Sequence, residues 1–223
     1  MASADSAHPI HRDLAGLRED YARAGLAEAD LAPDPLAMFG RWFDDAVAGG
    51  IHEPNAMVVA TVDPDGAPSA RIVLLKELTP EGFVFYTNHG SRKGAALAHE
   101  ARCSLLFPWH PLERQVRVDG VAELLDRDTV AAYFAVRPRS SQLGAWASHQ
   151  STVVGSRADL EAAYVEAEAR FEGGEVPVPE EWGGYLVRPS AVEFWQGRTG
   201  RLHDRLVYRA DGSGGWVTER LAP

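Results

Sequence analysis

The fold is decided by Ala56-Met-Val-Val-Ala-Thr-Val62, followed by Pro64-Asp-Gly66 and Ala70-Arg-Ile-Val-Leu-Leu-Lys76. The two outer stretches are apolar and rich in β-branched residues, which favours β-strands. Proline, aspartate and glycine between them favour a tight turn, each for its own conformational reason. This part of the chain therefore predicts two consecutive strands joined by a short turn.

The same pattern continues on both sides of this hairpin. Further strands are expected at residues 83–87, 101–107, 114–125, 184–187, 192–195, 205–208 and 216–220, and helices at 14–24, 35–48, 91–100, 129–136 and 156–171. Within 114–125, polar Gln115, Arg117 and Asp119 alternate with valines, so one face of that strand is polar. Many short strands with a few helices predict a mainly β fold, an antiparallel barrel with helical additions.

Composition sets the class of protein. The chain has 223 residues, of which 45% are hydrophobic and 24% charged, which is enough to bury a core. One domain is expected over residues 14–223, after a disordered tail over residues 1–13. The tail lacks the apolar and basic regions of a secretory signal, and the chain contains no apolar run of the roughly 18 residues that cross a membrane. A single cysteine, Cys103, lies in an apolar strand and is expected to be buried and inert, so the cytoplasm is the expected compartment.

The charge is acidic overall but locally basic. A formal charge of −10 argues against general binding of nucleic acid. Arginine and lysine instead gather in short polar motifs, which suit small anionic ligands.

The first basic motif is His89-Gly-Ser-Arg-Lys93. Ser91 is expected to cap a helix, which places Arg92 and Lys93 in its first turn. Cations are disfavoured there by the partial positive charge of the helix N-terminus. A bound phosphate would reverse that cost, because it accepts bonds from the free backbone N–H groups and from both side chains. The alternative is two solvated cations on a surface helix.

Two further motifs carry cations. Arg71 and Lys76 bracket an apolar strand, and their spacing points them to opposite faces, so they should meet different parts of a ligand or different ligands. The loop Arg137-Pro-Arg-Ser-Ser-Gln142 follows the helix that carries Tyr133, and its arginines and serines can grip a phosphate. Taken singly, the first of these two motifs is more typical of strand-edge charges, and the second is more typical of a plain surface loop.

The fourth motif combines aromatic and charged residues. Glu193-Phe-Trp-Gln-Gly197 precedes Arg201-Leu-His-Asp-Arg205, and together they could give a site with an apolar wall and a polar floor. The alternative is a core tryptophan beside a salt-bridged loop. The histidines lack the spacing of metal ligands, so a metal site is not expected.

In this order, the motifs resemble those of the pyridoxamine 5′-phosphate oxidase family, from about Leu17 to the last residue. The most specific stretches are Arg71 to Lys76, Phe85-Tyr-Thr-Asn88, Leu105-Leu-Phe-Pro-Trp-His110, Leu112-Glu-Arg-Gln115, Gln142-Leu-Gly-Ala-Trp146, Glu193 to Gly197 and Arg201 to Arg205. The resemblance implies an FMN-binding split β-barrel and a homodimer with FMN at each of two inter-subunit sites.

The resemblance also assigns residues. The family's flavin contacts fall on Arg71, Ile72, Val73, Leu74, Leu75, Lys76, Tyr86, Thr87, Arg92, Lys93, Gln115, Gln150, Ser151, Trp195 and Arg205. Its substrate contacts fall on Arg18, Tyr21, Lys76, Tyr133, Arg137, Ser141, Arg201, Leu202 and His203, of which Arg201 and His203 are the catalytic pair. The segment from Arg18 to Tyr21 is implied to close over the substrate, although Glu19 stands where the family commonly has a second basic residue.

The implied reaction is oxidation of pyridoxamine or pyridoxine 5′-phosphate at C4′, with FMN taking a hydride equivalent and dioxygen then giving hydrogen peroxide. Two phosphates would be bound, one by Arg71, Arg92 and Lys93 and the other by Lys76, Arg137 and Ser141. Two other functions remain open on the same barrel. One is a reductase that uses FMN or a deazaflavin, and the other is a storage or sensor module that binds flavin or haem. Neither would need the whole set of substrate residues.

Overall fold

The computed structural model describes Gly16, Tyr21 and residues 25–223. The predicted tail, most of the predicted helix at 14–24 and Arg18 lie outside the described residues. The proposal of one domain over residues 14–223 therefore stays a prediction.

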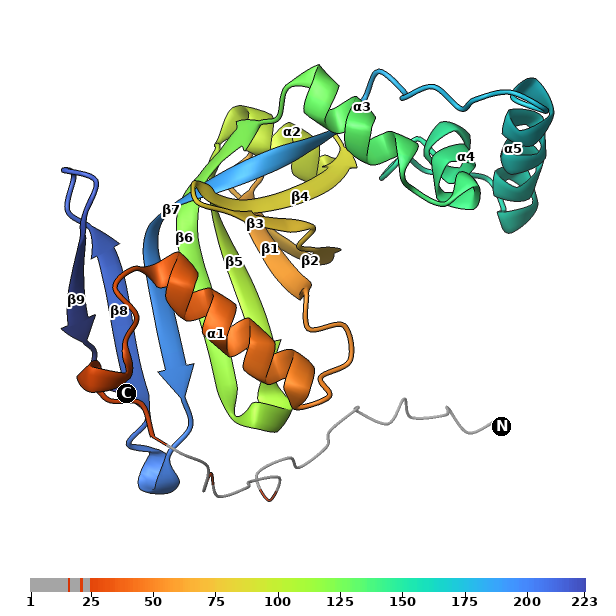
Figure 1. The fold of residues 1–223 in the computed structure, drawn as a ribbon. Helices are drawn as coiled ribbons and strands as arrows, with labels where there is room; N and C mark the ends of the chain where they lie inside the picture. The colour runs from red at the N-terminus through yellow and green to blue at the C-terminus, as the bar shows by residue number, and fades with distance from the viewer. Residues whose placement is uncertain (1–15, 17–20, 22–24) are drawn as a thin grey trace, which may run out of the picture.

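Among the described residues, nine antiparallel strands form one sheet (Figure 1). Its path runs β2-β1-β5-β6-β7-β4-β3, and β8 pairs with β7 and then with β9. The strands are β1 (Ala56–Val62), β2 (Pro68–Leu74), β3 (Glu77–Thr79), β4 (Gly82–Asn88), β5 (Arg102–Trp109), β6 (Arg114–Leu124), β7 (Trp182–Gln196), β8 (Asp204–Ala210) and β9 (Trp216–Arg220). The sheet curls, and α1 (Pro35–Ala48) lies across its open side. The prediction of a mainly β fold is confirmed.

The main core joins α1 to the concave side of the sheet. Asp34 caps the helix by accepting the N–H groups of Leu36 and Ala37, and Pro35 occupies the first helical position, where a missing N–H costs little. Phe39 on its inner face packs against Phe83 and Phe107, with ring centroids 5.0 and 4.8 Å away. The predicted range of this helix, 35–48, is confirmed at both ends.

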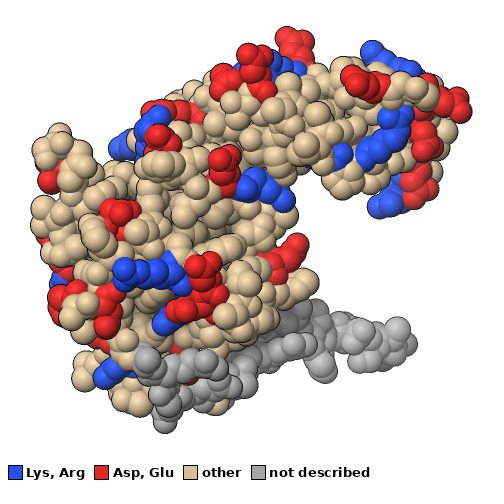
Figure 2. Space-filling model, in the orientation of Figure 1, with Lys and Arg blue, Asp and Glu red and all other residues tan. Residues whose placement is uncertain are grey.

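A second, smaller core lies in a helical arm that extends from the sheet. The arm contains α3 (Arg127–Ala135), α4 (Arg139–Ala147) and α5 (Arg157–Arg170), whereas α2 (Arg92–His99) lies against the barrel. Val130 and Phe134 of α3 and Leu143 of α4 are buried here with Trp182, the first residue of β7. Figure 2 shows the surface hollowed beneath this arm, with acidic and basic groups intermingled on the face drawn.

Four predicted segments differ in the structure. The strands expected at 184–187 and 192–195 are one strand, β7, because the chain stays paired with β6 throughout. A register shift at Asp119/Gly120 accommodates Pro189 within this pairing. The expected loop after Arg137 becomes helical at Arg139, where α4 begins. The strand expected to reach Lys76 ends at Leu74, because the N–H of Lys76 bonds to the carbonyl of Val84 instead.

Candidate active site

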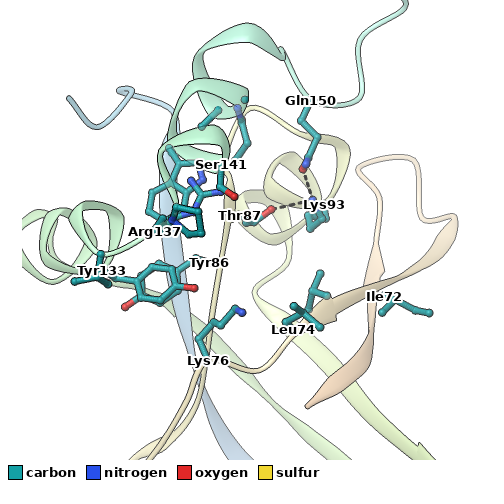
Figure 3. A pocket seen from close by; sticks show the side chains of 17 residues that line it. Ile72, Leu74, Lys76, Tyr86, Thr87, Lys93, Tyr133, Arg137, Ser141 and Gln150 are labelled. Carbon is teal, nitrogen blue, oxygen red and sulfur yellow. Dashed lines mark hydrogen bonds between the residues drawn. The ribbon is translucent and has the colours of Figure 1, made fainter. Parts of the chain in front are cut away.

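A cavity of about 660 Å³ lies between the sheet and the arm (Figure 3). Strands β2 and β4 supply one side and helices α3 and α4 the other. Eleven of the predicted site residues line it: Ile72, Val73, Leu74, Lys76, Tyr86, Thr87, Lys93, Tyr133, Arg137, Ser141 and Gln150. Residues of three of the four motifs, distant in sequence, therefore meet at one cavity, whereas those of the fourth motif do not line it.

Lys93 is a buried cation at one end of the cavity. Its side chain leaves α2, and the residue is only 8% exposed. Its Nζ donates to Thr87 Oγ1 at 2.9 Å, to Ser91 Oγ at 3.2 Å and to Gln150 Oε1. All three acceptors are uncharged. Burial, with a smaller effect of nearby Arg71, lowers the pKa of Lys93 to about 8. A buried ammonium surrounded by neutral oxygens favours an anionic ligand.

The side chain of Arg92 does not line the cavity, unlike that of its neighbour Lys93. Its guanidinium forms an ion pair with Asp63, and its side chain is 64% exposed. Asp63 in turn accepts from Ser69, whose hydroxyl also accepts from Arg71 at 2.6 Å. The pair with Arg92 holds the pKa of the Asp63 carboxyl below its usual value. Arg71 and Arg92 are thus joined through Asp63, a residue that the sequence analysis did not single out. Its position just before the Pro64-Asp-Gly66 turn was the only signal.

The other side of the cavity carries Tyr133, Arg137 and Ser141, and Lys76 reaches into the cavity from below in the view of Figure 3. Tyr133 stacks on Tyr86, with ring centroids 3.9 Å apart and planes 11° from parallel. Nη1 of Arg137 is buried and has no hydrogen-bond partner among the described residues. An unpaired buried donor is rare because its desolvation is costly, so this N–H is suited to a ligand oxygen.

A second group of predicted residues gathers around the far end of β7. Trp195 and His203 lie with ring centroids 4.6 Å apart, and Tyr21 packs on both at 6.0 and 5.8 Å. Gly197 permits that packing, since a Cβ there would lie 2.8 Å from the Tyr21 ring. Nδ1 of His203 accepts the backbone N–H of Arg198 at 3.1 Å, which leaves the proton of the neutral ring on Nε2.

The other members of this second group are held in different ways. Arg201 is exposed and has a left-handed φ of 61°, a strained conformation of the kind found at functional sites. Exposed Leu202 follows it. Arg205 forms a two-pronged ion pair with the buried carboxylate of Glu193, at 2.7 and 3.1 Å, so its guanidinium is already engaged. Gln115 faces Trp195 across the β6–β7 ladder.

Within one chain the two groups lie far apart. Trp182 lines the cavity and begins β7, whereas Trp195 is almost at the end of that strand. Thirteen residue steps at about 3.3 Å each make a path of roughly 40 Å along the strand. Ser151 lies outside both groups in the exposed loop after Gln150, and Leu75 is buried in the main core. One chain therefore does not bring all the predicted residues to one cavity.

Two other findings bear on the class of site. Among the described residues, acidic, histidine and cysteine side chains do not gather in threes in a way that could hold a metal ion. In the same residues, helices long and apolar enough to span a membrane are not found. Cys103 is buried in β5, and burial raises the pKa of its thiol to about 12, as expected for an inert strand residue.

Comparison with known proteins gives consistent results. Residues 43–171 match the family described as pyridoxamine 5′-phosphate oxidase, and residues 182–223 match the pyridoxine 5′-phosphate oxidase C-terminal dimerisation region. A protein of Nocardioides sp. named pyridoxine/pyridoxamine 5′-phosphate oxidase is 69% identical over 96% of this chain and 99% of its own length. One of the same name from Rubrobacter xylanophilus is 58% identical over 95% of this chain and 97% of its own length.

Among solved structures, PhzG from Burkholderia lata, in complex with tetrahydrophenazine-1-carboxylic acid, superposes with a TM-score of 0.82 at 31% identity. The match covers 87% of this chain and 95% of PhzG. A related FMN-binding protein of Nostoc punctiforme, 14% identical over 86% of this chain and all of its own, has a TM-score of 0.68 and shares the fold. The expected split β-barrel is confirmed. The chain belongs to the pyridoxamine 5′-phosphate oxidase family of flavin-binding oxidoreductases.

Proposed function

We propose that this protein oxidises pyridoxamine 5′-phosphate and pyridoxine 5′-phosphate to pyridoxal 5′-phosphate in the cytoplasm, with FMN as cofactor and dioxygen as acceptor. The observation that carries the proposal is a single cavity with an anion-seeking group at each end, Lys93 at one and the unpaired N–H of Arg137 at the other. A phosphorylated cofactor bound beside a phosphorylated substrate requires two cationic groups, one for each phosphate. Relatives 69 and 58% identical carry the corresponding name.

The residues at the Lys93 end fit a flavin phosphate. Lys93 would bind the phosphate of FMN together with Arg71, while Thr87 and Gln150 orient the ammonium. Arg71 is held by Val59, Thr61 and Ser69 rather than by a carboxylate of its own, so its charge remains available to an anion. Arg92 would act through its link to Asp63, or exchange that partner for the phosphate.

We infer that the working unit is a homodimer. The residues Trp195, Arg201, His203 and Arg205 all fall within the stretch that matches the C-terminal dimerisation region. A second copy would bring this group to the cavity that it cannot reach within its own chain. Ile72 and Val136, which line the cavity, are 71 and 78% exposed, and Leu202 beside the catalytic pair is 74% exposed. Large apolar side chains left exposed around a site are typical of an interface.

The proposed roles follow from position. Lys76, Tyr133, Arg137 and Ser141 would hold the substrate phosphate and fix the distance from it to C4′. When bound, FMN supplies the acceptor for the hydride equivalent from that carbon and the means of reaction with dioxygen.

At the reacting carbon, Arg201 would orient the substrate. His203, with its proton on Nε2, would present a hydrogen-bond donor rather than a free base. Tyr21, packed on His203 and Trp195, would shield this region from water.

The test is a turnover assay on protein reconstituted with FMN. Pyridoxamine 5′-phosphate should yield pyridoxal 5′-phosphate and hydrogen peroxide in equal amounts, and unphosphorylated pyridoxamine should be a much poorer substrate. Protein that binds FMN but gives neither product would refute the proposal and favour a reductase.

A further inference from the structure

Trp182 lies against the phosphate-binding end of the cavity, and the motifs of the sequence analysis did not include it. We propose that Trp182 is a positioning residue that aims Arg137 and Tyr133 at the phosphate group of the substrate. The inference rests on the proposed function, because it concerns how the phosphate of that substrate is selected.

Three aromatic rings lie nearly parallel to one another beside the cavity. The planes of Trp182 and Tyr133 differ by 6°, as do those of Trp182 and Tyr86, with centroids 6.1 and 5.5 Å apart. Tyr133 and Tyr86 lie closer still, at 3.9 Å. Offset parallel rings at these distances attract one another beyond their burial. Trp182 thereby fixes the ring plane of Tyr133, a residue that arrives from a different element.

The same indole supports Arg137. The guanidinium carbon lies 4.6 Å from the Trp182 ring centroid and 5.3 Å from that of Phe134. A planar guanidinium that rests on an aromatic face keeps its N–H groups in its own plane, free to bond at their edges. This arrangement explains how Nη1 of Arg137 stays buried without a protein partner among the described residues. The stacking stabilises the charge, and the N–H remains free for a phosphate oxygen.

Trp182 is itself held firmly. It is only 6% exposed, and Phe134 packs edge-on against it at 4.9 Å. Arg127, at the start of α3, donates to its carbonyl oxygen at 2.7 Å, and also to the carbonyls of Val178 and Pro179. The backbone of Trp182 is therefore bonded to the start of α3, while its indole ring supports Tyr133 and Arg137 near the other end of that helix. This fixation makes it a rigid base for both phosphate ligands.

The expected effect is specific to phosphate. A desolvated cation–π contact contributes enough to change affinity about tenfold when it is lost. Because the phosphate is not the reacting group, its grip contributes almost equally to the ground state and the transition state. Loss of Trp182 should therefore raise KM about tenfold and leave kcat within about twofold.

The experiment measures binding to the FMN-loaded protein, with two probes that cannot be oxidised or form a Schiff base. They are 4-deoxypyridoxine 5′-phosphate and unphosphorylated 4-deoxypyridoxine, titrated by calorimetry. Trp182→Leu should weaken binding of the phosphorylated probe about tenfold and of the other less than twofold. Trp182→Phe, which keeps an aromatic face, should recover part of the loss. Equal weakening of both probes, or no weakening, would overturn the proposal.

Trp146→Leu is a matched control. Trp146 also carries an arginine on its ring, Arg170 at 4.8 Å, but it does not line the cavity. This variant should bind both probes as the unchanged protein does. If Trp182→Leu fails to fold, Trp182→Phe decides alone, with a loss of about threefold expected for the phosphorylated probe only.

A double-mutant cycle separates this proposal from the proposed function. If Arg137→Ala leaves the phosphorylated probe equally well bound, the phosphate site itself is wrong. If Arg137→Ala weakens it but Trp182→Leu does not, only the role of Trp182 is wrong. We expect Trp182→Leu to weaken binding of the phosphorylated probe less in the Arg137→Ala background than on its own, because part of its effect acts through that arginine.

Discussion

At the scale of single residues, the charge of Lys93 should control cofactor affinity. Its pKa is about 8 because it is buried and lies near Arg71, and a bound phosphate would raise that pKa. Binding therefore favours the protonated lysine, so affinity for FMN should be full below about pH 8 and fall above it by at most about tenfold per pH unit. Titration of flavin-free protein with FMN between about pH 7 and 9 measures this. Affinity that stays constant or rises with pH would contradict it, and Lys93→Met should flatten the profile.

Arg137 should contribute to substrate binding rather than to the chemical step. Its unpaired N–H lies at the phosphate end of the cavity, remote from the proposed site of hydride transfer. Loss of one charge-assisted bond costs about 1.5–3 kcal/mol, so Arg137→Ala should raise KM about ten- to a hundredfold and leave kcat nearly unchanged. Steady-state kinetics with pyridoxamine 5′-phosphate tests the split. A fall in kcat as large as the rise in KM would mean that this arginine also positions C4′.

At the scale of elements, β9 should hold the segment around Leu26 against β8. Arg220 donates to Glu28 at 2.7 Å, to Asp204 at 2.6 Å and to the carbonyl of Leu26 at 3.0 Å. Arg220 lowers the pKa of Glu28 to about 2, and a carboxyl with a depressed pKa stabilises the fold at neutral pH but not at low pH. Arg220→Ala should therefore lower Tm at pH 7. The difference in Tm between the variant and the unchanged protein should shrink as pH falls from about 4.5 toward about 2.

Salt and a matched variant make that prediction sharper. The ion pairs of Arg220 are largely exposed, so added salt should also reduce the difference in Tm between Arg220→Ala and the unchanged protein. Arg209→Ala removes a single exposed pair with Glu219 on the same hairpin and should change Tm less. Equal decreases in Tm for the two variants, or a difference in Tm that does not change with pH, would contradict the role of Arg220 in holding the segment around Leu26.

The elements themselves were largely readable from the sequence, for local reasons. An apolar, β-branched run predicted β1, and alternation of polar residues with valines predicted β6. Apolar residues at helical spacing after Pro35 predicted α1. These elements agree with their predictions within a residue or two. The start of α4 was missed because Pro138 and the following arginine and serines are typical of a loop. The contacts of Arg92 with Asp63 and of Arg137 with Trp182 join segments distant in sequence, and a single sequence does not encode which tertiary partner a cation takes.

For the complete protein, activity should require two chains. Light scattering should find a dimer at assay concentration, since the groups around Arg137 and His203 lie at opposite ends of β7. Two variants that are poor alone, Arg137→Ala and His203→Ala, should complement each other when their subunits are mixed. Half of the dimers would be mixed and each would have one intact site, which gives about a quarter of full activity at low substrate. An active monomer, or mixtures that regain nothing, would contradict this.

In the proposed reaction, this protein takes a hydride equivalent from a phosphorylated substrate, and anaerobic stopped-flow with FMN-loaded protein measures that step alone. We expect pyridoxamine 5′-phosphate to reduce the bound flavin without any nicotinamide, and air to restore the oxidised spectrum with release of peroxide and aldehyde. Arg201→Ala and His203→Ala should slow the reduction even at saturating substrate, whereas Arg137→Ala should not. A flavin that stays oxidised with pyridoxamine 5′-phosphate, yet is reduced by a nicotinamide donor, would contradict the account and identify a reductase.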